Sequence, residues 1–290
     1  MSRRATRFAA GFVALAILES DRAADRPPGR EFFFGGLLKT PSLNDSRVST
    51  RIEWARFDSI SADALVNTWR IDYAFGNRWG VHASMPWAVG FARTRATGPR
   101  EATSAAGNIV VGGKLRLLPI VGVARAAILV EVQSALGGRT NAANQLGVFS
   151  DWVAVRRFYP RRITIPVMIS ADMHWTGVSV GAAGGLDVSL PFGFSDPEAV
   201  VHGRFEYGAS MTFLKPLAIT AEYVARFGVR TDVRFRVATT RLETFHILVL
   251  GAQAHLGNWV LKVGDIIPLG QPTDDPRQSA HLFLDVGYRL

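Results

Sequence analysis

Several features are scarce or absent in this chain of 290 residues, and each absence narrows the class of protein. Cysteine is absent, which excludes a disulfide framework and cysteine-based metal or redox chemistry. Beyond the N-terminus there is no uninterrupted apolar run of the roughly 18 residues that a membrane-spanning helix needs. Acidic residues number 24 against 33 basic ones, for a net charge of +9. Because the basic residues are spread along the chain rather than clustered, nucleic acid is not an expected partner.

Residues 65–87 show what the chain has instead: apolar and polar side chains alternate with a period of two, the pattern of a β-strand. The alternation runs to Phe75, turns at Gly76-Asn77-Arg78 and starts again at Trp79, as in a hairpin. One face of this hairpin is aromatic at both ends and aliphatic between, while the other face carries charged side chains. This pattern predicts a hairpin standing in a bilayer, with its apolar face toward lipid and its polar face toward a lumen.

The same alternation recurs along the chain and predicts about twelve strands. Short connections alternate with long polar ones, as in outer-membrane barrels with tight periplasmic turns and extended external loops. We therefore expect an all-β fold, namely a transmembrane antiparallel up-and-down β-barrel over residues 48–290. If the glycine-interrupted residues 176–199 add a hairpin, the number of strands is about fourteen instead of twelve. Pro166 conflicts with a strand interior unless it lies at an edge or bulge. The predicted strands are residues 48–57, 65–75, 79–87, 107–118, 124–135, 149–158, 163–175, 201–213, 217–227, 245–256, 259–267 and 280–290, with short connections at Gly76, Pro119, Pro160, Pro216 and Gly257 and a polar loop at 91–106.

The two ends of the chain have the features of export and assembly signals. Arg3, Arg4 and Arg7, followed by the apolar residues 8–18, predict a signal peptide over residues 1–24, with a short membrane anchor as the alternative. Residues 25–47 are rich in Pro and Gly and predict a lead-in that lies in the periplasm or plugs the lumen. The last strand, Ala280 to Leu290, resembles the C-terminal assembly signal of outer-membrane proteins. The expected partners are outer-membrane lipid, the barrel-assembly machinery and small-molecule solutes, and the expected location is the outer membrane of a bacterial cell.

The inward faces of the predicted strands hold the candidate functional residues. Their cationic excess would make a water-filled lumen favour anions, whereas salt bridges between them would close it. We expect these side chains to set selectivity. The candidate lumen residues are Arg51, Glu53, Arg70, Asp72, His82, Lys114, Arg116, Arg125, Glu131, Arg204, Glu206, Glu222, Arg226 and Lys262. The candidate aromatic girdle on the outward faces is Trp54, Trp69, Tyr73, Trp79, Trp87, Trp175, Tyr207, Tyr223, Trp259 and Tyr288.

Two short motifs resemble those of a known family. Residues 35–42 (GGLLKTPS) are similar to the opening segment, and residues 107–116 (GNIVVGGKLR) to a strand motif, of outer-membrane channels assigned to transport in aromatic (phenol) degradation pathways. The resemblance implies a channel through which small solutes, apolar ones among them, diffuse. The resemblance assigns no catalytic residue to this chain.

One motif has a catalytic interpretation, the Gly-x-Ser-x-Gly around Ser179, with Asp172 and His174 upstream. A nucleophile elbow needs a strand, a sharp turn and a helix, and no amphipathic helix follows Ser179. The histidines lack metal-ligand spacing, so neither a metal nor another cofactor is expected. We predict a non-enzymatic, porin-like channel for the passive passage of small solutes, anionic or aromatic ones included. An outer-membrane hydrolase using Ser179 and a non-conducting structural barrel stay open as alternatives.

Overall fold

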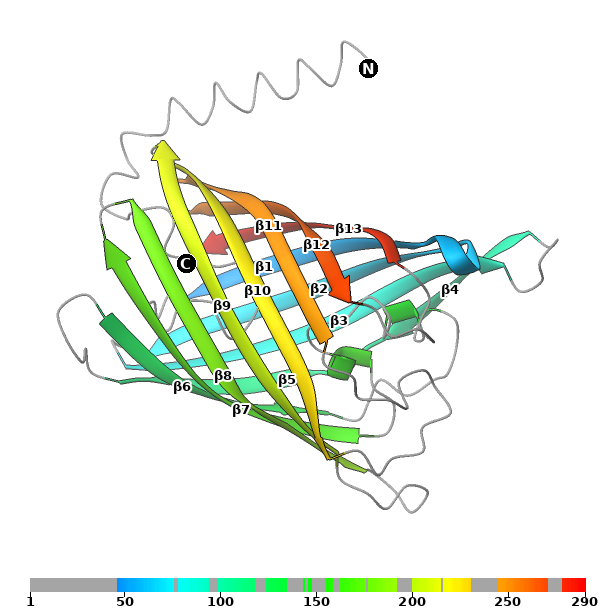
Figure 1. Cartoon of the computed structure of the whole chain (residues 1–290), viewed down its shortest axis with the longest axis horizontal. Coiled ribbons are helices and arrows are strands. Elements are labelled where there is room, and N and C mark those ends of the chain that lie inside the picture. Colours follow the sequence, from blue (N-terminus) through cyan, green and yellow to red (C-terminus); the bar gives the residue numbers. More distant parts are fainter. Residues whose placement is uncertain are drawn as a thin grey trace, which may run out of the picture.

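Thirteen strands and two short 3-10 helices make up most of the described part of the molecule, a computed structural model (Figure 1). The structure describes residues 46–75, 78–93, 99–117, 124–134, 143, 146–147, 155–158, 162–175, 177–191, 200–214, 216–230, 245–270 and 278–290. The predicted signal peptide (1–24) and residues 25–45 of the predicted lead-in lie outside the described residues.

The strands follow one another around a single sheet. They are β1 (Arg47–Phe57), β2 (Ala62–Phe75), β3 (Trp79–Arg93), β4 (Arg100–Ala106), β5 (Val110–Arg116), β6 (Ala124–Gln133), β7 (Arg162–Trp175), β8 (Val178–Pro191), β9 (Val200–Leu214), β10 (Leu217–Arg230), β11 (Phe245–Leu256), β12 (Trp259–Gly270) and β13 (Gln278–Arg289). The 3-10 helices are η1 (Asp58–Ile60) and η2 (Val155–Phe158). None of the helical segments in these ranges is long and apolar enough to cross a membrane.

The sheet closes on itself because the first strand pairs with the last. β1 and β13 are antiparallel, with Val48 opposite Tyr288 and Trp54 opposite Leu282, and the two lie side by side in Figure 1. Every other strand pair is antiparallel too, and strands that are neighbours in the chain are neighbours in the wall. The predicted all-β, up-and-down antiparallel barrel is therefore confirmed.

β4 and β5 occupy one place in the wall, so the barrel has twelve strands. The C-terminal part of β3, residues 87–93, pairs with β4, and its N-terminal part, residues 79–84, pairs with β5. The register shifts between the two parts: Trp87 is opposite Ala106, whereas Ser84 is opposite Val110. Residues 85 and 86 thus face residues 107, 108 and 109, which is a bulge. Pro86 lies at this point and cannot donate a ladder hydrogen bond. The predicted number of about twelve strands is confirmed, and the alternative of fourteen is wrong.

Three local predictions are wrong, although two of the errors cancel in the strand count. Residues 155–158 form η2 rather than the end of a strand over 149–158, and β7 pairs with β6 and β8, not with that segment as the hairpin predicted at Pro160 requires. Residues 149–154 and 159–161 lie outside the described residues. Instead β7 turns at Gly177 directly into β8, which fills most of the ambiguous stretch 176–199. The polar loop predicted over 91–106 contains β4. The connection from β6 to β7, residues 134–161, is therefore the longest in the chain.

Proline and glycine fit the wall through local adjustments. Pro166 lies inside β7, as predicted, and the ladder to β6 is interrupted beside it: the pairing goes from Val130 with Val167 directly to Gln133 with Thr164. The missing N–H of proline accounts for this gap. Gly177 and Gly257 have φ of 77° and 60°, a left-handed conformation that suits glycine at a tight hairpin turn.

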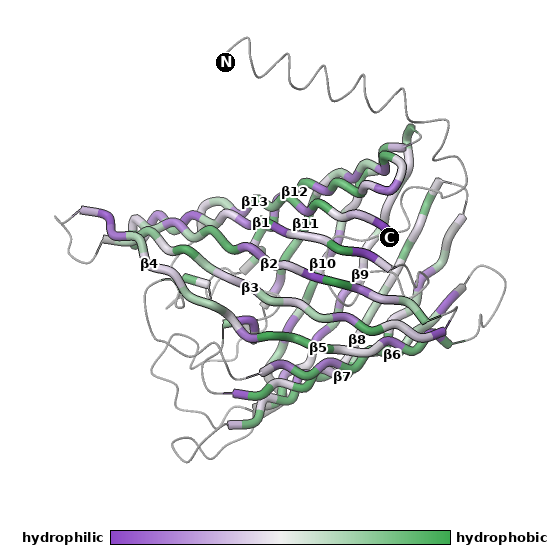
Figure 2. The backbone as a smooth tube through the Cα atoms, turned by 180° about the vertical axis from the view of Figure 1, so that it is seen from behind, coloured by the Kyte–Doolittle hydropathy of each residue, from purple (hydrophilic) through white to green (hydrophobic). Residues whose placement is uncertain are grey.

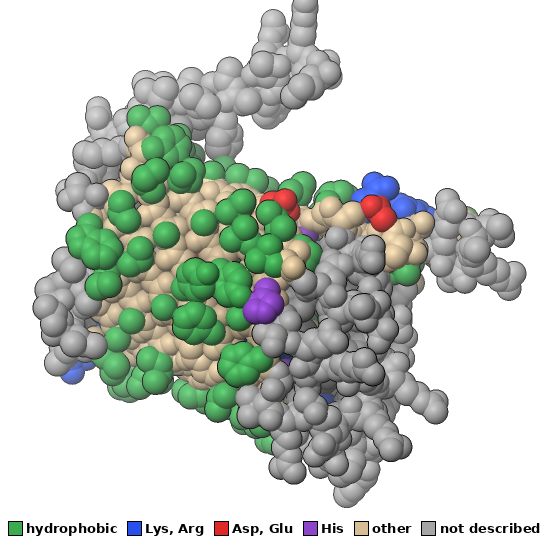
Figure 3. Space-filling model, viewed as in Figure 1, with side chains coloured by type: hydrophobic (Ala, Val, Ile, Leu, Met, Phe, Trp, Pro, Cys, Tyr) green, Lys and Arg blue, Asp and Glu red, His purple; other side chains and the backbone are tan. Residues whose placement is uncertain are grey.

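The two faces of the wall differ in chemistry, as the alternating colours along the strands in Figure 2 show. Large hydrophobic side chains are exposed on the outside, and hydrophobic side chains spread over the face seen in Figure 3. Charged and hydroxyl side chains are buried on the inside. An apolar exterior around a polar interior is the inverse of a soluble barrel and is suited to a bilayer.

Candidate functional site: the barrel interior

All fourteen predicted lumen residues lie on the inward faces of their strands, where they alternate with the exposed apolar positions. They divide into two sets by burial. Six remain partly exposed, namely Arg51, Arg70, Asp72, Lys114, Arg116 and Arg125. Eight are fully buried, namely Glu53, His82, Glu131, Arg204, Glu206, Glu222, Arg226 and Lys262.

The partly exposed set lies toward the end of the barrel where the short turns are, and we call it the basic vestibule. Lys114 and Arg116 end β5, and Arg125 is the second residue of β6. Because these side chains are inside the wall yet partly exposed, water reaches this half of the interior. The vestibule holds five basic residues against one acidic one, Asp72. Among these six side chains positive charge is therefore in excess.

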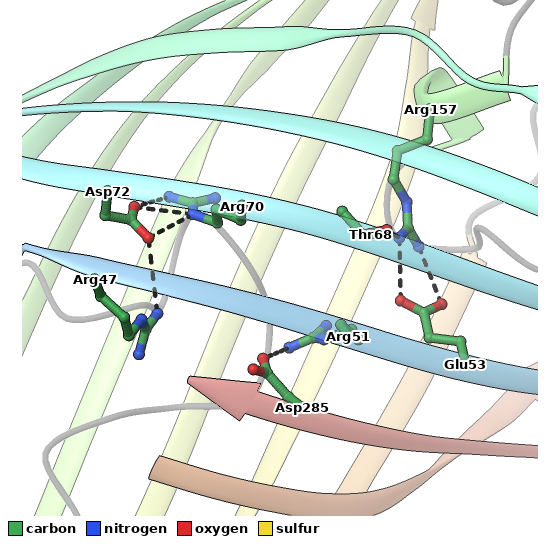
Figure 4. A network of polar contacts seen from close by, with 8 residues as sticks. All are labelled: Arg47, Arg51, Glu53, Thr68, Arg70, Asp72, Arg157 and Asp285. Atoms are coloured by element: carbon green, nitrogen blue, oxygen red, sulfur yellow. Dashed lines mark hydrogen bonds and ion pairs between the residues drawn. The ribbon is translucent and has the colours of Figure 1, made fainter. Parts of the chain in front are cut away.

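Three ion pairs hold vestibule side chains in place (Figure 4). Arg70 donates to both carboxylate oxygens of Asp72, with Nε 2.9 Å from Oδ1 and 3.0 Å from Oδ2, and Nη2 of Arg47 lies 3.9 Å from Asp72 Oδ2. Arg51 Nη2 lies 3.2 Å from Asp285 Oδ2 on β13. The Asp72 carboxylate therefore pairs with two guanidinium groups, and the charge of Lys114 also interacts with it. The buried carboxylate of Asp172 acts on Lys114 and Arg116 as well.

A histidine and a glutamate form a buried contact across β5. His82 on β3, Gly112 on β5 and Glu131 on β6 are cross-strand neighbours in one row. His82 Nε2 lies 2.8 Å from Glu131 Oε1, and both side chains are almost completely buried. A Cβ atom at Gly112 would come within 2.5 Å of His82 Cε1 and 2.7 Å of Glu131 Cγ. The contact exists because residue 112 has no side chain.

The remaining buried charges gather on β9 and β10. Arg204 and Glu206 form an ion pair along β9, and Arg226 of β10 stands directly opposite Arg204. Glu222 lies four residues before Arg226 in β10, on the same inward face. Lys262 is distant from this group, on β12, opposite Asp285. These residues hold the wall together rather than face water, since each is at most 8% exposed.

An apolar patch separates these two charged regions on the inner wall. It consists of Val224, Ile247, Val249, Ile266 and Phe283, on the four neighbouring strands β10 to β13. The guanidinium carbon of Arg51 stands 5.1 Å from the centre of the Phe283 ring, within range of a cation–π contact. Each residue of the patch is at most 5% exposed, so the patch is a packed apolar layer of the inner wall with the partly exposed Arg51 at its edge.

The most important interior residue that sequence reasoning missed is Arg157. It belongs to η2, which folds into the barrel from the connection between β6 and β7 (Figure 4). Its Nη1 and Nη2 lie 3.1 Å from Oε1 and Oε2 of Glu53, and its Nη1 lies 2.9 Å from Thr68 Oγ1. The alternation of residues 149–158 suggested a strand and gave no sign of this contact. Only a signal for non-local pairing with Glu53, 104 residues away, could have revealed it.

The β7–β8 register places Ser179 directly opposite His174, but the local backbone is not that of a nucleophile elbow. Ser179 is the second residue of β8, buried on the inner face, and strand continues on through the Gly-x-Ser-x-Gly motif to Pro191. The helix that a nucleophile elbow requires does not follow it. Among the described residues, no group of three or more His, Asp or Glu side chains could hold a metal ion.

The predicted girdle residues lie on the outward faces. Eight of the ten are well exposed, with Trp69 and Trp79 the most exposed at 57%, while Trp54 and Tyr223 are intermediate. Trp259 and Tyr288 pack edge to face beside the turn that joins β11 and β12. Tyr223 is hydrogen-bonded through its hydroxyl to Nδ1 of His246, so the polar group of this outward histidine is satisfied within the wall.

Comparison with known proteins gives matches only at the level of structure. Neither family models nor characterised sequences match the chain. The structure is similar to an outer membrane channel from Pseudomonas putida F1, with TM-score 0.63 and 11% identity over 90% of this chain and 100% of that one. It is also similar to the NanC porin (TM-score 0.53, 7% identity, 84% of this chain and 100% of that one). The KdgM porin is comparable (TM-score 0.52, 11% identity, 84% and 99%).

At such low identity the likeness concerns the fold. The chain folds as a bacterial outer-membrane β-barrel. A closed barrel of twelve antiparallel strands with an apolar, aromatic-rich exterior is the architecture of proteins in the bacterial outer membrane.

Proposed function

We propose that this barrel is a passive channel for small solutes and that its basic vestibule makes it favour anions. The observation that carries the proposal is the composition of the vestibule, five basic residues and one acidic one, partly exposed inside a closed wall. A lumen in which basic side chains outnumber acidic ones attracts small anions and repels small cations. The structural likeness to outer-membrane channels and porins agrees with this function.

We further propose that carboxylates with an aromatic or aliphatic body are favoured solutes. Arg51, which is partly exposed beside the buried Phe283 ring, can meet the carboxylate of such a solute. The motif at residues 107–116, which resembles channels of aromatic-degradation pathways, supports the same class. The KdgM porin, similar in fold, has been solved in complex with a disordered oligogalacturonate, a chain of sugar carboxylates.

The orientation follows from the connections. We place the short turns, and with them the vestibule, on the periplasmic side, because outer-membrane barrels carry tight turns there and long loops outside. Solutes from outside would then pass η2 first and the basic vestibule last.

Ion selectivity in planar bilayers tests the proposal. The purified protein is inserted into a bilayer under a KCl gradient, and the reversal potential reports the preference for chloride or potassium. We expect the wild type to favour chloride. The double variant Lys114→Glu/Arg116→Glu changes the vestibule from five positive charges and one negative to three of each, so its reversal potential should move toward potassium.

Arg56→Glu is the matched control, because Arg56 is an exposed arginine that pairs with Asp58 on the outward side. It should leave the selectivity unchanged. An equal shift in the control and the vestibule variant would contradict the assignment of selectivity to the vestibule. A correctly folded wild type that conducts no ions would instead favour the non-conducting structural barrel.

A further inference from the structure

The short helix η2 is attached to the inside of the wall at three points. Phe158 is completely buried and packs with Val66 and Ala88 of β2 and β3. The carbonyl oxygen of Arg157 accepts a hydrogen bond of 2.7 Å from the main-chain N–H of Asn108, in the bulge between β4 and β5. The third attachment is the Arg157 side chain itself, which reaches β1 and β2.

The Arg157 side chain has the geometry of a carboxylate-binding site with a carboxylate already in it. Its two terminal nitrogens each lie 3.1 Å from a different oxygen of Glu53, and Thr68 accepts a third contact from Nη1. Two parallel N–H···O contacts are the arrangement in which arginine recognises free carboxylates. Arg157 keeps 17% of its side chain exposed, whereas Glu53 keeps 2%. Arg157 is thus the more exposed side chain of the pair.

Glu53 can release Arg157 without being left as an isolated charge. His281 Nε2 lies 3.4 Å from Glu53 Oε2, and the positive charge of Arg51 also acts on this carboxylate. A buried carboxylate that lost its only partner would be strongly destabilised, but here two neighbours remain. Exchange of Arg157 from Glu53 to another carboxylate is therefore feasible.

The same place adjoins the apolar patch. Glu53 and Phe283 are cross-strand neighbours on β1 and β13, so the Arg157 fork and the patch meet at this point of the wall.

We propose that Arg157 is the residue that recognises the carboxylate of a passing solute, and that Glu53 occupies its fork when no solute is bound. Solute and Glu53 compete for one guanidinium. This inference rests on the proposed channel function and adds a named recognition residue on the loop side, separate from the vestibule.

The test is block of single-channel chloride current by sodium benzoate in planar bilayers, with benzyl alcohol as the uncharged analogue. We expect benzoate to block the wild type, and its half-blocking concentration to rise at least tenfold in Arg157→Ala. In Glu53→Gln, which removes the competing charge, it should fall several-fold. Arg157→Lys should lie between the wild type and Arg157→Ala, because an ammonium cannot present the fork. Benzyl alcohol should act equally on all variants.

Arg56→Ala serves as the control arginine, and the heat-modifiable mobility of each variant on gels establishes that its barrel is folded. If Arg157 only fastened η2, Arg157→Ala would change the chloride conductance but leave the half-blocking concentration of benzoate within twofold of the wild type. That result overturns the inference while the channel function stands. If neither the wild type nor any variant conducts, the proposed function fails, and this inference with it.

Discussion

The variant Gly112→Ala tests the account of the buried His82–Glu131 contact. The added Cβ would lie 2.5 Å from His82 Cε1, 2.7 Å from His82 Nε2 and 2.7 Å from Glu131 Cγ, distances that non-bonded atoms do not reach. Both side chains must then move apart, and their contact of 2.8 Å is lost. Overpacking costs about 1–3 kcal/mol, and a buried polar group without its partner about 1–3 kcal/mol more. We expect the free energy of unfolding to fall by about 2–6 kcal/mol.

The neighbouring residue supplies a matched control. A Cβ atom at Gly113 points to the exposed face and would have only the carbonyl oxygen of Gly80 near it, at 3.9 Å. Gly113→Ala should therefore leave the stability within about 0.5 kcal/mol of the wild type. Urea unfolding of both variants in lipid vesicles, followed by tryptophan fluorescence, measures the difference. Equal stability of the two variants would refute the reasoning, because it would mean that the row of His82 and Glu131 has room for a methyl group.

Three further predictions concern the turns, the rim and the C-terminus. Gly257→Ala should destabilise the barrel by about 1 kcal/mol in the same unfolding assay, since the left-handed φ of 60° is costly for alanine. Arg100→Ala breaks a contact of 2.7 Å with Asp63, but the arginine is 41% exposed, so the loss should stay below about 1 kcal/mol. The double variant Tyr288→Ala/Leu290→Ala should lower the amount of folded barrel in the outer membrane of cells while refolding in detergent remains efficient. Poor refolding in detergent as well would show that these residues act through stability rather than through the assembly machinery.

The hairpin over residues 65–87 could be predicted from the sequence because its two faces meet different solvents. Lipid outside selects aromatic and aliphatic side chains, and the polar interior selects charged ones, so the period of two is clear. The pairing of Asn67 with Trp87 and of Phe75 with Trp79 agrees with the predicted turn at Gly76. The inward direction of the fourteen candidate residues followed from the same alternation.

The errors in the strand prediction have physical causes. The inward face of β8 begins with Ser179, Gly181, Ala183 and Gly185, and such small residues give little contrast with the outward face. Glycines inside that stretch suggest a break, but in the wall they are flanked by paired strands on both sides. The strand predicted over residues 149–158 is wrong for a different reason, an apolar residue that faces the interior. Phe158 is apolar because it packs inside the barrel, and periodicity cannot separate inner packing from contact with lipid.

Which interior charges meet could not be predicted, because that depends on closure of the barrel. Arg51 and Asp285 are 234 residues apart and become neighbours only when β1 pairs with β13. Arg157 and Glu53 meet only because η2 folds inward. Alternation fixes the face of a residue, whereas its partner is fixed by register and by the path of the connections.

The central claim, that this barrel passes small carboxylates, is tested most directly by uptake into proteoliposomes. Vesicles with the purified wild type and protein-free vesicles are mixed with labelled benzoate or with benzylamine, a cation of similar size, at a pH where both are charged. The account predicts that the protein accelerates the entry of benzoate and accelerates it more than the entry of benzylamine. Benzoate entry equal to that of protein-free vesicles, or faster entry of benzylamine, would contradict it.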